Sequence, residues 1–438
     1  MLAILYEDNH LLVVEKPVNV PAQADSSGDA DLLSQCKAYI KEKYEKPGEV
    51  YLGLVHRLDR PVGGIMVFAR TSKAAARLTE QFASRTAKKR YAALVEGAPK
   101  ARARLSGYLI KDETTGTSRM AGANESGAKA AALEYRRLTA LEDKTLVDVA
   151  LFTGRHHQIR CQLASAGYPI WGDQRYNPAA KPGQQLALWA YMLSFEHPVK
   201  KEPLRFFSRP NGPAWEPFSE ELAALAAGVR LAYIDADVLA VDKDAGMSVA
   251  TEDGGDSLEA RLKSALGEEI YPVHRLDVAT EGLVLFARNP RAADALEEAI
   301  KLRAIGKYYR CEVHGSPKRD EAELRAWLVK DPEGATVRIY DEKRAGAKEI
   351  VTRYRILERR EKTALLEVEL VTGRTHQIRA HLAHAGLPLL GDDRYGDREC
   401  DRQLSVKGLS LRAVRLALAF PQGSFLTRLN GKTISVED

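Results

Sequence analysis

The chain has 438 residues, of which 45% are apolar and 29% are charged, the balance of an ordinary soluble globular protein. This length exceeds what one domain usually needs and suits two domains of about 200 residues, each large enough to bury a core. The net charge of +5 permits a polyanionic partner but does not by itself indicate one. No stretch of 18 apolar residues occurs, so we expect no membrane span.

Cysteine spacing and the start of the chain bear on location and metal binding. The four cysteines are widely separated, without a CxxC pair, at Cys36, Cys161, Cys311 and Cys400. This usage is typical of a reducing compartment and offers no metal-ligand spacing. The chain turns acidic at Glu7 and lacks the basic segment that begins a secretory signal. We therefore expect a cytoplasmic protein with no bound metal.

The first half alternates between hairpins and helices. Residues 4–16 predict two strands joined at a turn, and a buried-looking strand at 65–69 leads into a helix that Thr71 or Ser72 can cap. The side chains of residues 146–151 alternate in sidedness, which predicts a half-buried strand. A helix that ends at Gly167 follows this strand.

The same order of elements and polar blocks returns in the second half, 218 or 219 residues later. Because the blocks keep this register over about 115 residues, we infer a duplicated domain. The repeated blocks are His56–Asp59 and His274–Asp277, Tyr91 and Tyr309, Thr153–Arg155 and Thr372–Arg374, and Gly172–Tyr176 and Gly391–Tyr395.

The boundary between the copies is expected near residue 228. A Pro/Gly-rich loop at 210–217 and a short helix from Ser219 to Gly228 come directly before the second repeat. We therefore predict domains at 1–228 and 229–438. Hairpins outnumber regular βαβ units, so each domain is predicted to be α+β, with a mixed, largely antiparallel sheet flanked by helices.

An Asp occupies a polar, turn-like segment between two apolar strands in both copies, at Asp59 and Asp277. A single Asp there could equally be a turn cap. An Asp that acts as a nucleophile or base must stay ionised, and a neighbouring Arg favours that charged form. Arg155 and Arg374, expected at strand ends, are the candidate partners. A purely structural Asp–Arg pair between strands remains the alternative.

Tyr91 follows Lys88-Lys89-Arg90, and Tyr309 follows Lys307-Tyr308. A flipped nucleobase can stack on such a ring while its phosphates meet the cations. The alternative is a strand Tyr packed into the sheet beside a solvated basic run.

The histidines of both repeats are interpreted as hydrogen-bonded structural residues; they are His56 and His274 in the first block, and His157 and His376 in the third. Neither half has a glycine pattern for nucleotides, so we expect no cofactor. The His-Arg-Leu-Asp block resembles a kinase catalytic loop, but the other kinase motifs are missing.

Taken together, the ordered blocks resemble the RluA-type pseudouridine synthases over nearly the whole chain, twice. The blocks that carry the resemblance are His-Arg-Leu-Asp, the basic residues before Tyr91 and Tyr309, Thr-Gly-Arg-x-His-Gln-Ile-Arg, and Gly-Asp-x-x-Tyr. The resemblance implies a cofactor-free isomerisation of uridine in RNA, begun by the Asp as a nucleophile at C1′ or as a base at C2′.

The resemblance also assigns roles to individual residues. It makes Asp59 and Asp277 the catalytic carboxylates, pairs them with Arg155 and Arg374, and places Tyr91 and Tyr309 against the flipped uracil. Arg57 and Arg275 match a position that helps to displace the base from its stack. This chain departs from the family pattern near both Asp residues and at Gln162, where the second copy has His381. We expect both sites to be chemically competent.

Three functions follow for comparison. The first is a double-headed RNA pseudouridine synthase acting on ribosomal or transfer RNA, without an obligate protein partner. The second keeps one domain catalytic and uses the other to dock RNA. The third is a noncatalytic RNA-binding or ribosome-assembly protein, which would not need an Asp–Arg pair in both halves.

Overall fold

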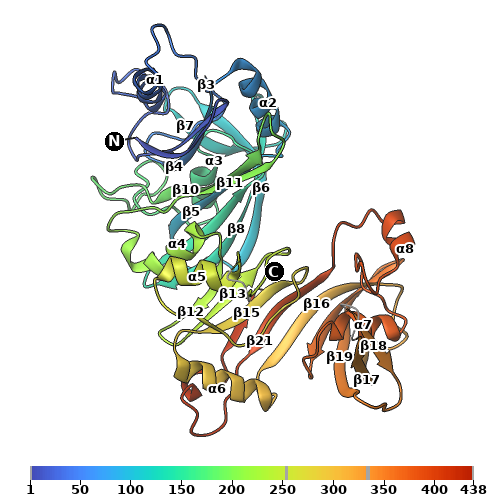
Figure 1. Cartoon of the computed structure of the whole chain (residues 1–438). Coiled ribbons are helices and arrows are strands. Elements are labelled where there is room, and N and C mark those ends of the chain that lie inside the picture. Colours follow the sequence, from blue (N-terminus) through green and yellow to red (C-terminus); the bar gives the residue numbers. More distant parts are fainter. Residues whose placement is uncertain (1, 252–254, 332–335, 437–438) are drawn as a thin grey trace. The chain divides into compact units, whose positions relative to one another are not determined.

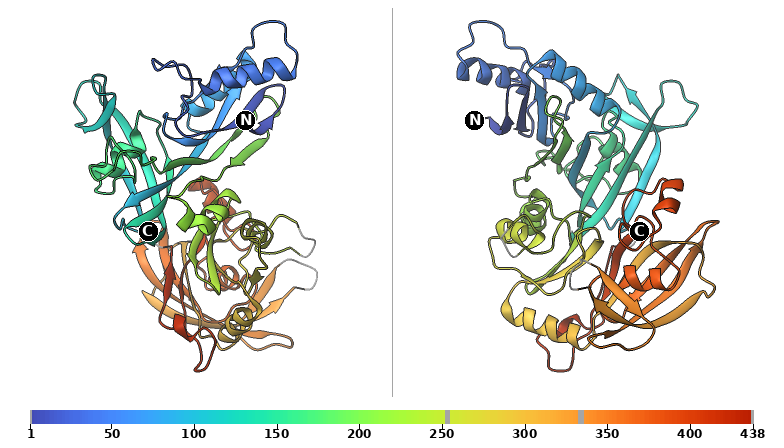
Figure 2. Two further views of the ribbon diagram at one scale, coloured as in Figure 1. Left: turned by 90° about the vertical axis from the view of Figure 1, so that its left-hand side faces the viewer. Right: turned by 45° about the vertical axis from the view of Figure 1, so that its right-hand side comes forward.

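A computed structural model describes the whole chain except residues 1, 252–254, 332–335 and 437–438. The chain divides into two compact units, unit 1 at Met1–Gly228 and unit 2 at Val229–Glu437 (Figure 1). In both views of Figure 2 the strands of each unit form one twisted layer with helices against it. Within the described ranges, no helix has the length and apolar character that crossing a membrane requires.

Unit 1 is built on one 11-stranded sheet in the order β1-β2-β4-β10-β5-β9-β8-β6-β7, with β11 on β10 and β3 on β4. All of these pairs are antiparallel except β4 with β10. Its strands are β1 (Ala3–Glu7), β2 (Leu11–Lys16), β3 (Gly53–Leu54), β4 (Gly63–Ala69), β5 (Lys88–Glu96), β6 (Arg102–Asp112), β7 (Thr117–Ala121), β8 (Lys129–Leu141), β9 (Lys144–Leu151), β10 (Leu188–Glu196) and β11 (Pro203–Phe207). Its helices are α1 (Leu32–Lys43), α2 (Ser72–Ala83), α3 (Gln158–Ser165) and α4 (Ser219–Ala226).

Unit 2 repeats this plan in the order β12-β13-β15-β21-β16-β20-β19-β17-β18, with β14 on β15 and β22 on β21. Its strands are β12 (Leu231–Ile234), β13 (Val238–Lys243), β14 (Tyr271–Pro272), β15 (Glu281–Ala287), β16 (Gly306–His314), β17 (Glu321–Lys330), β18 (Val337–Tyr340), β19 (Lys348–Arg359), β20 (Thr363–Leu370), β21 (Leu411–Ala417) and β22 (Thr433–Ser435). Its helices are α5 (Leu258–Leu266), α6 (Pro290–Lys301), α7 (Gln377–His384) and α8 (Arg398–Gln403). The predicted fold class, two α+β units with mixed, largely antiparallel sheets, is confirmed.

Local capping signals explain where the helices after the central strands begin. The Thr71 hydroxyl accepts a hydrogen bond from the Ala74 amide at 3.2 Å and so caps α2. Asn289 caps α6 through the Ala292 amide at 2.9 Å, with Pro290 at the first helical position. Such caps satisfy amides that the first turn of a helix leaves without partners.

The prediction that residues 146–151 form a half-buried strand is wrong for most of β9. Leu146, Val147, Asp148 and Val149 are all buried, so both faces of the strand are covered. The polar member of the pattern is accommodated by partners, because the Asp148 carboxylate accepts a hydrogen bond from the Tyr191 hydroxyl at 2.9 Å and pairs with an arginine of β5. Alternation alone cannot distinguish a solvated carboxylate from a buried and paired one.

A glycine permits the parallel pairing of β4 with β10. Gly64 has φ of +119° and lies against the backbone of Ala190, where a Cβ atom would collide with the carbonyl group. Gly282 meets Ala413 in the same way in unit 2. This close approach fixes the strand that directly follows the Asp-bearing loop in each unit.

Candidate active site

Asp59 lies in the loop between β3 and β4, and a buried lysine anchors that loop. The Lys16 ammonium at the end of β2 is fully buried and donates to the carbonyl oxygens of Pro17 (2.9 Å), Val20 (2.6 Å) and Arg60 (2.9 Å). Burial lowers the pKa of Lys16 to about 7, against the opposing effect of the negative charge on Asp59. The lysine therefore holds the residue next to Asp59 to the core of the sheet.

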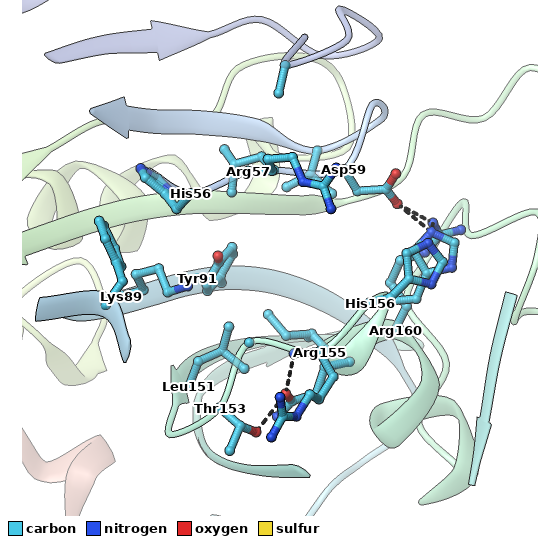
Figure 3. A pocket seen from close by; sticks show the side chains of 18 of the residues that line it. His56, Arg57, Asp59, Lys89, Tyr91, Leu151, Thr153, Arg155, His156 and Arg160 are labelled. Carbon is cyan, nitrogen blue, oxygen red and sulfur yellow. Dashed lines mark hydrogen bonds and ion pairs between the residues drawn. The ribbon is translucent and has the colours of Figure 1, made fainter. Parts of the chain in front are cut away.

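The Asp59 carboxylate is paired with two groups from the start of α3. Arg160 Nη1 lies 2.5 Å and His157 Nε2 3.0 Å from Asp59 Oδ2, while 30% of the Asp59 side chain stays exposed (Figure 3). Burial opposes ionisation of Asp59, but its hydrogen bond and charge interaction with His157, followed by those with Arg160, outweigh burial and hold the pKa of that carboxyl well below its usual range. Asp59 is thus ionised and still open on one side.

A second carboxylate fixes Arg160. Asp173 is completely buried and accepts from Arg160 Nε at 2.8 Å and Nη2 at 2.6 Å. This two-pronged contact leaves Nη1 directed at Asp59. Asp173 belongs to the repeated Gly-Asp-x-x-Tyr block, so this block positions the partner of the reactive carboxylate.

His157 is held in an unusual backbone conformation. Its φ of 49° and ψ of 22° place it in the left-handed region just before α3, and His376 repeats this in unit 2 with φ of 53°. The Tyr176 hydroxyl accepts from the Ser118 amide at 2.6 Å and lies 2.9 Å from His157 Nδ1. With Nδ1 bonded to the Tyr176 hydroxyl, His157 presents Nε2 to Asp59 at 3.0 Å, the distance of an N–H donor to a carboxylate.

The predicted pairing of Arg155 with Asp59 is wrong. Arg155 is exposed in the loop between β9 and α3, where its Nε donates to the Ala130 carbonyl at 3.0 Å. In Figure 3 it lies near Thr153, whereas the Asp59 carboxylate points towards Arg160. The loop holds Arg155 by its backbone, because the Gln158 side-chain oxygen accepts from the Arg155 amide at 3.0 Å and from the Thr153 hydroxyl at 2.7 Å.

The same correction applies to unit 2. Arg374 is exposed, its amide donates to Gln377 Oε1 at 3.1 Å, and the arginine nearest to Asp277 is Arg379. One sequence signal could have identified the pairing residues. Arg160 and Arg379 each follow a block histidine by three positions on a helix, a spacing that places both side chains on one face.

Both pairs of block histidines have hydrogen-bond partners in the structure, but in different surroundings. His56 and His274 are structural, since their Nε2 atoms accept from the amides of Val67 (3.1 Å) and Leu285 (3.0 Å), and burial lowers the pKa of each to about 3. His157, by contrast, contacts the Asp59 carboxylate directly.

Tyr91 and Arg57 line the same cavity as Asp59, and the volume of this cavity is about 800 Å³. The Tyr91 side chain is buried in β5 with 6% exposure, and burial raises its pKa above the usual range. Arg57 is exposed. Lys89 also lines the cavity, and burial lowers its pKa. Tyr309 is equally buried in unit 2, at 5% exposure.

Unit 2 contains the same groups in a looser arrangement. Asp277 Oδ2 lies 3.7 Å from Arg379 Nη1 and 3.8 Å from His376 Nε2. Arg379 is bound by the buried Asp392 at 2.6 Å, and also by Asp393 at 2.9 Å. Unit 1 has a glutamine at the position of Asp393, so an additional carboxylate competes for the arginine only in unit 2.

The lysine anchor recurs in unit 2. Lys243 is fully buried and donates to the carbonyl oxygens of Asp244 (3.1 Å), Met247 (2.9 Å) and Val278 (3.0 Å). Burial lowers its pKa to about 8. Within the described ranges, no group of His, Cys, Asp or Glu side chains is arranged to hold a metal ion.

Comparison with known proteins matches a family model to both halves of the chain and similar proteins to about half of it. A family model described as RNA pseudouridylate synthase matches residues 10–165 and 237–384. Ribosomal large subunit pseudouridine synthase D of Zymomonas mobilis is 32% identical over 216 residues, 47% of this chain and 68% of that protein. Ribosomal large subunit pseudouridine synthase C of Escherichia coli K12 is 34% identical over 235 residues, 52% of this chain and 72% of that protein. The solved structure of Human RNA Pseudouridylate Synthase Domain Containing 1 aligns with a TM-score of 0.41 and 22% identity, over 48% of this chain and 83% of that one.

Proposed function

Because the chain belongs to the RNA pseudouridylate synthase family, and is thus an enzyme that isomerises uridine in RNA, we propose that Asp59 and Asp277 are its catalytic carboxylates. The two catalytic domains are then 1–228 and 229–438. The observation that carries this proposal is the state of Asp59, which is ionised, held by Arg160 and His157, and open to a cavity. A carboxylate that served only as a structural cap would not need to face a cavity.

The reaction breaks the bond between C1′ and N1 of uridine, turns the base, and joins C1′ to C5. The proton on C5 is lost and N1 gains one, so the overall change is an isomerisation that needs no cofactor. Asp59 acts either by attacking C1′ or by removing the proton from C2′, and both routes require the ionised form. Arg160 and His157 on Oδ2, together with the Arg60 amide that donates to Oδ1 at 2.8 Å, keep that form available and fix the orientation of the carboxylate.

The remaining cavity residues are assigned to recognition of the base. We propose that Tyr91 and Tyr309 stack on the uracil, since each is a buried aromatic of the central sheet and Tyr91 lines the cavity that Asp59 faces. Arg57 and Arg275 are exposed two residues before the catalytic Asp, which suits them to fill the space that a flipped base leaves.

The target RNA is proposed from the named relatives. Both similar proteins are called ribosomal large subunit pseudouridine synthases, so ribosomal RNA is the favoured substrate and transfer RNA the alternative. A cytoplasmic location and the lack of an obligate protein partner stay predictions.

One observation favours a variant of this proposal, in which unit 1 is catalytic and unit 2 docks RNA. The distances from Asp277 to its two partners, 3.7 and 3.8 Å, exceed the 2.5 and 3.0 Å at Asp59. The weaker hold in unit 2 leaves its carboxylate less precisely aimed.

Tritium release from RNA labelled at uracil C5 tests both versions, because isomerisation must expel that hydrogen. The wild type is compared with D59A, D277A and the double variant, and with D143A, which removes an exposed carboxylate elsewhere in unit 1. Loss of all release in the double variant is expected. Full release in the double variant would exclude Asp59 and Asp277 as the catalytic residues. Loss in D59A alone, with no effect of D277A, would establish the docking version.

A further inference from the structure

An exposed aromatic ring stands at the rim of the unit 1 cavity. Phe152 directly follows β9, is 37% exposed and contributes to the cavity lining. The guanidinium carbon of Arg104 lies 4.8 Å from the centre of its ring. Among the described residues, no carboxylate pairs with Arg104, and its cross-strand neighbour Glu134 is bound by Arg102 at 3.1 Å. The arginine is therefore available to a ligand on this ring.

The surface around Phe152 continues along β6 and β8. Arg104 and Tyr108 share one face of β6, because they alternate with residues such as Leu109 that pack with α3. Tyr108 is 36% exposed. Its cross-strand partner Ala130 accepts the Arg155 side-chain hydrogen bond, so this second arginine lies on the same part of the sheet. Two aromatic rings and Arg104 are thus exposed on this part of the sheet, with Arg155 bonded to the neighbouring strand β8.

We propose that Phe152 and Arg104 form a stacking site for a nucleobase of the RNA strand that flanks the uridine at Asp59. This inference rests on the proposed function of unit 1. Aromatic side chains with adjacent arginines bind unpaired RNA because every base has a face that can stack, and the cations meet the phosphates. Arg155, which does not serve Asp59, gains a role here as a phosphate contact.

Unit 2 lacks this site. Its residue at the position of Phe152 is Val371, and strand register places Glu323 where unit 1 has Arg104. Glu323 is already neutralised by Arg353 and Arg325, each at 2.7 Å. The ring is missing and a paired glutamate replaces the arginine, so the proposed stacking site belongs to unit 1 alone.

Photocrosslinking gives a test that does not depend on activity. Single-stranded RNA of about 12 nucleotides containing 4-thiouridine is irradiated with the full-length chain, and labelled tryptic peptides are mapped. We expect a crosslink in the peptide Thr145–Arg155, weakened by F152V and retained by F152W. L141A, which removes an exposed apolar side chain at the far end of β8, serves as the control. Crosslinks that omit this peptide would overturn the proposal.

Kinetics in the D277A variant separate this inference from the proposed function. Tritium release then reports unit 1 alone, and F152V should raise KM by about 5- to 150-fold, the equivalent of about 1–3 kcal/mol of stacking per base, with little change in kcat. Absence of release with Phe152 intact would refute the catalytic role of Asp59, whereas the crosslink would still report the stacking site. Normal release with an unchanged KM in F152V would refute the stacking site and leave the catalytic role standing.

Discussion

Replacing Arg160 with methionine should destabilise unit 1 far more than replacing the neighbouring Arg155. The Arg160 side chain is only 6% exposed and is bound to Asp59 on one side and to Asp173 on the other. Methionine preserves much of the length of the side chain but removes the charge. The variant therefore leaves Asp173 completely buried without its cation.

The expected cost is about 3–5 kcal/mol, the range for removing one partner of a buried ion pair. The lower part of this range applies, because the amides of Arg175 (3.1 Å) and Tyr176 (3.3 Å) still donate to Asp173. Removing both charges in R160M/D173N should cost less than R160M alone, since no unpaired carboxylate then remains. R155A should change the stability by no more than about 0.5 kcal/mol, because that side chain is exposed.

Urea unfolding followed by tryptophan fluorescence provides the measurement. In a W327F background the remaining tryptophans are Trp171, Trp189 and Trp215, all in unit 1, so the signal reports that unit. An R160M variant as stable as R155A would refute the assignment of Arg160 as the central cation. Additive effects in the double variant would refute the coupling with Asp173.

Three further predictions use the same unfolding assay. G64A should cost more than about 2 kcal/mol, because a backbone φ of +119° is strained for alanine and the added Cβ would collide with Ala190. A G64A protein of normal stability would contradict this close approach of β4 and β10. K16M should cost about 2 kcal/mol or more and reduce tritium release from unit 1, since three carbonyl groups lose their hydrogen-bond donor. Unchanged stability and release would show that the loop does not need this anchor. The pKa of Asp59 is lower in the folded protein than in the unfolded chain, where it is about 3.9. The ionised carboxylate therefore stabilises unit 1 above about pH 4, and this stabilisation is lost as the pH falls through the folded pKa. The difference in stability between wild type and D59N should therefore shrink between about pH 5 and pH 2, and a constant difference would argue against the depressed pKa.

Short-range features of the fold could be predicted from sequence because they depend on local chemistry. The first hairpin and the cap at Thr71 follow from turn and capping residues within a few positions of each other. The order of the strands could not be predicted in the same way. The parallel pair of β4 and β10 joins Gly63 to Trp189, and no local signal links residues so distant in sequence.

The sequence predicted which blocks form the site, but not which side chains contact one another within it. The duplication located Asp59 and Tyr91, which the structure places on one cavity. It could not decide which arginine serves Asp59, because Arg155 and Arg160 recur with the same spacing in both copies. That choice depends on where α3 begins, since Arg155 precedes the helix and Arg160 lies on its first turn.

Comparison of the two units separates constraints of stability from constraints of chemistry. The groups they share, a lysine anchor, an Asp, a His, an Arg and a buried second Asp, form one connected network, and losing a buried charged member costs about 3–5 kcal/mol. The residues that differ, such as Phe152 against Val371 and Arg104 against Glu323, lie on exposed or open surface, where substitutions cost about 0.5 kcal/mol. Stability alone therefore maintains much of the network in unit 2, even if that unit no longer catalyses. Repetition of the motif is consequently weaker evidence for activity in unit 2 than the distances around Asp277, and the single-site variants D59A and D277A decide the question that the motif leaves open.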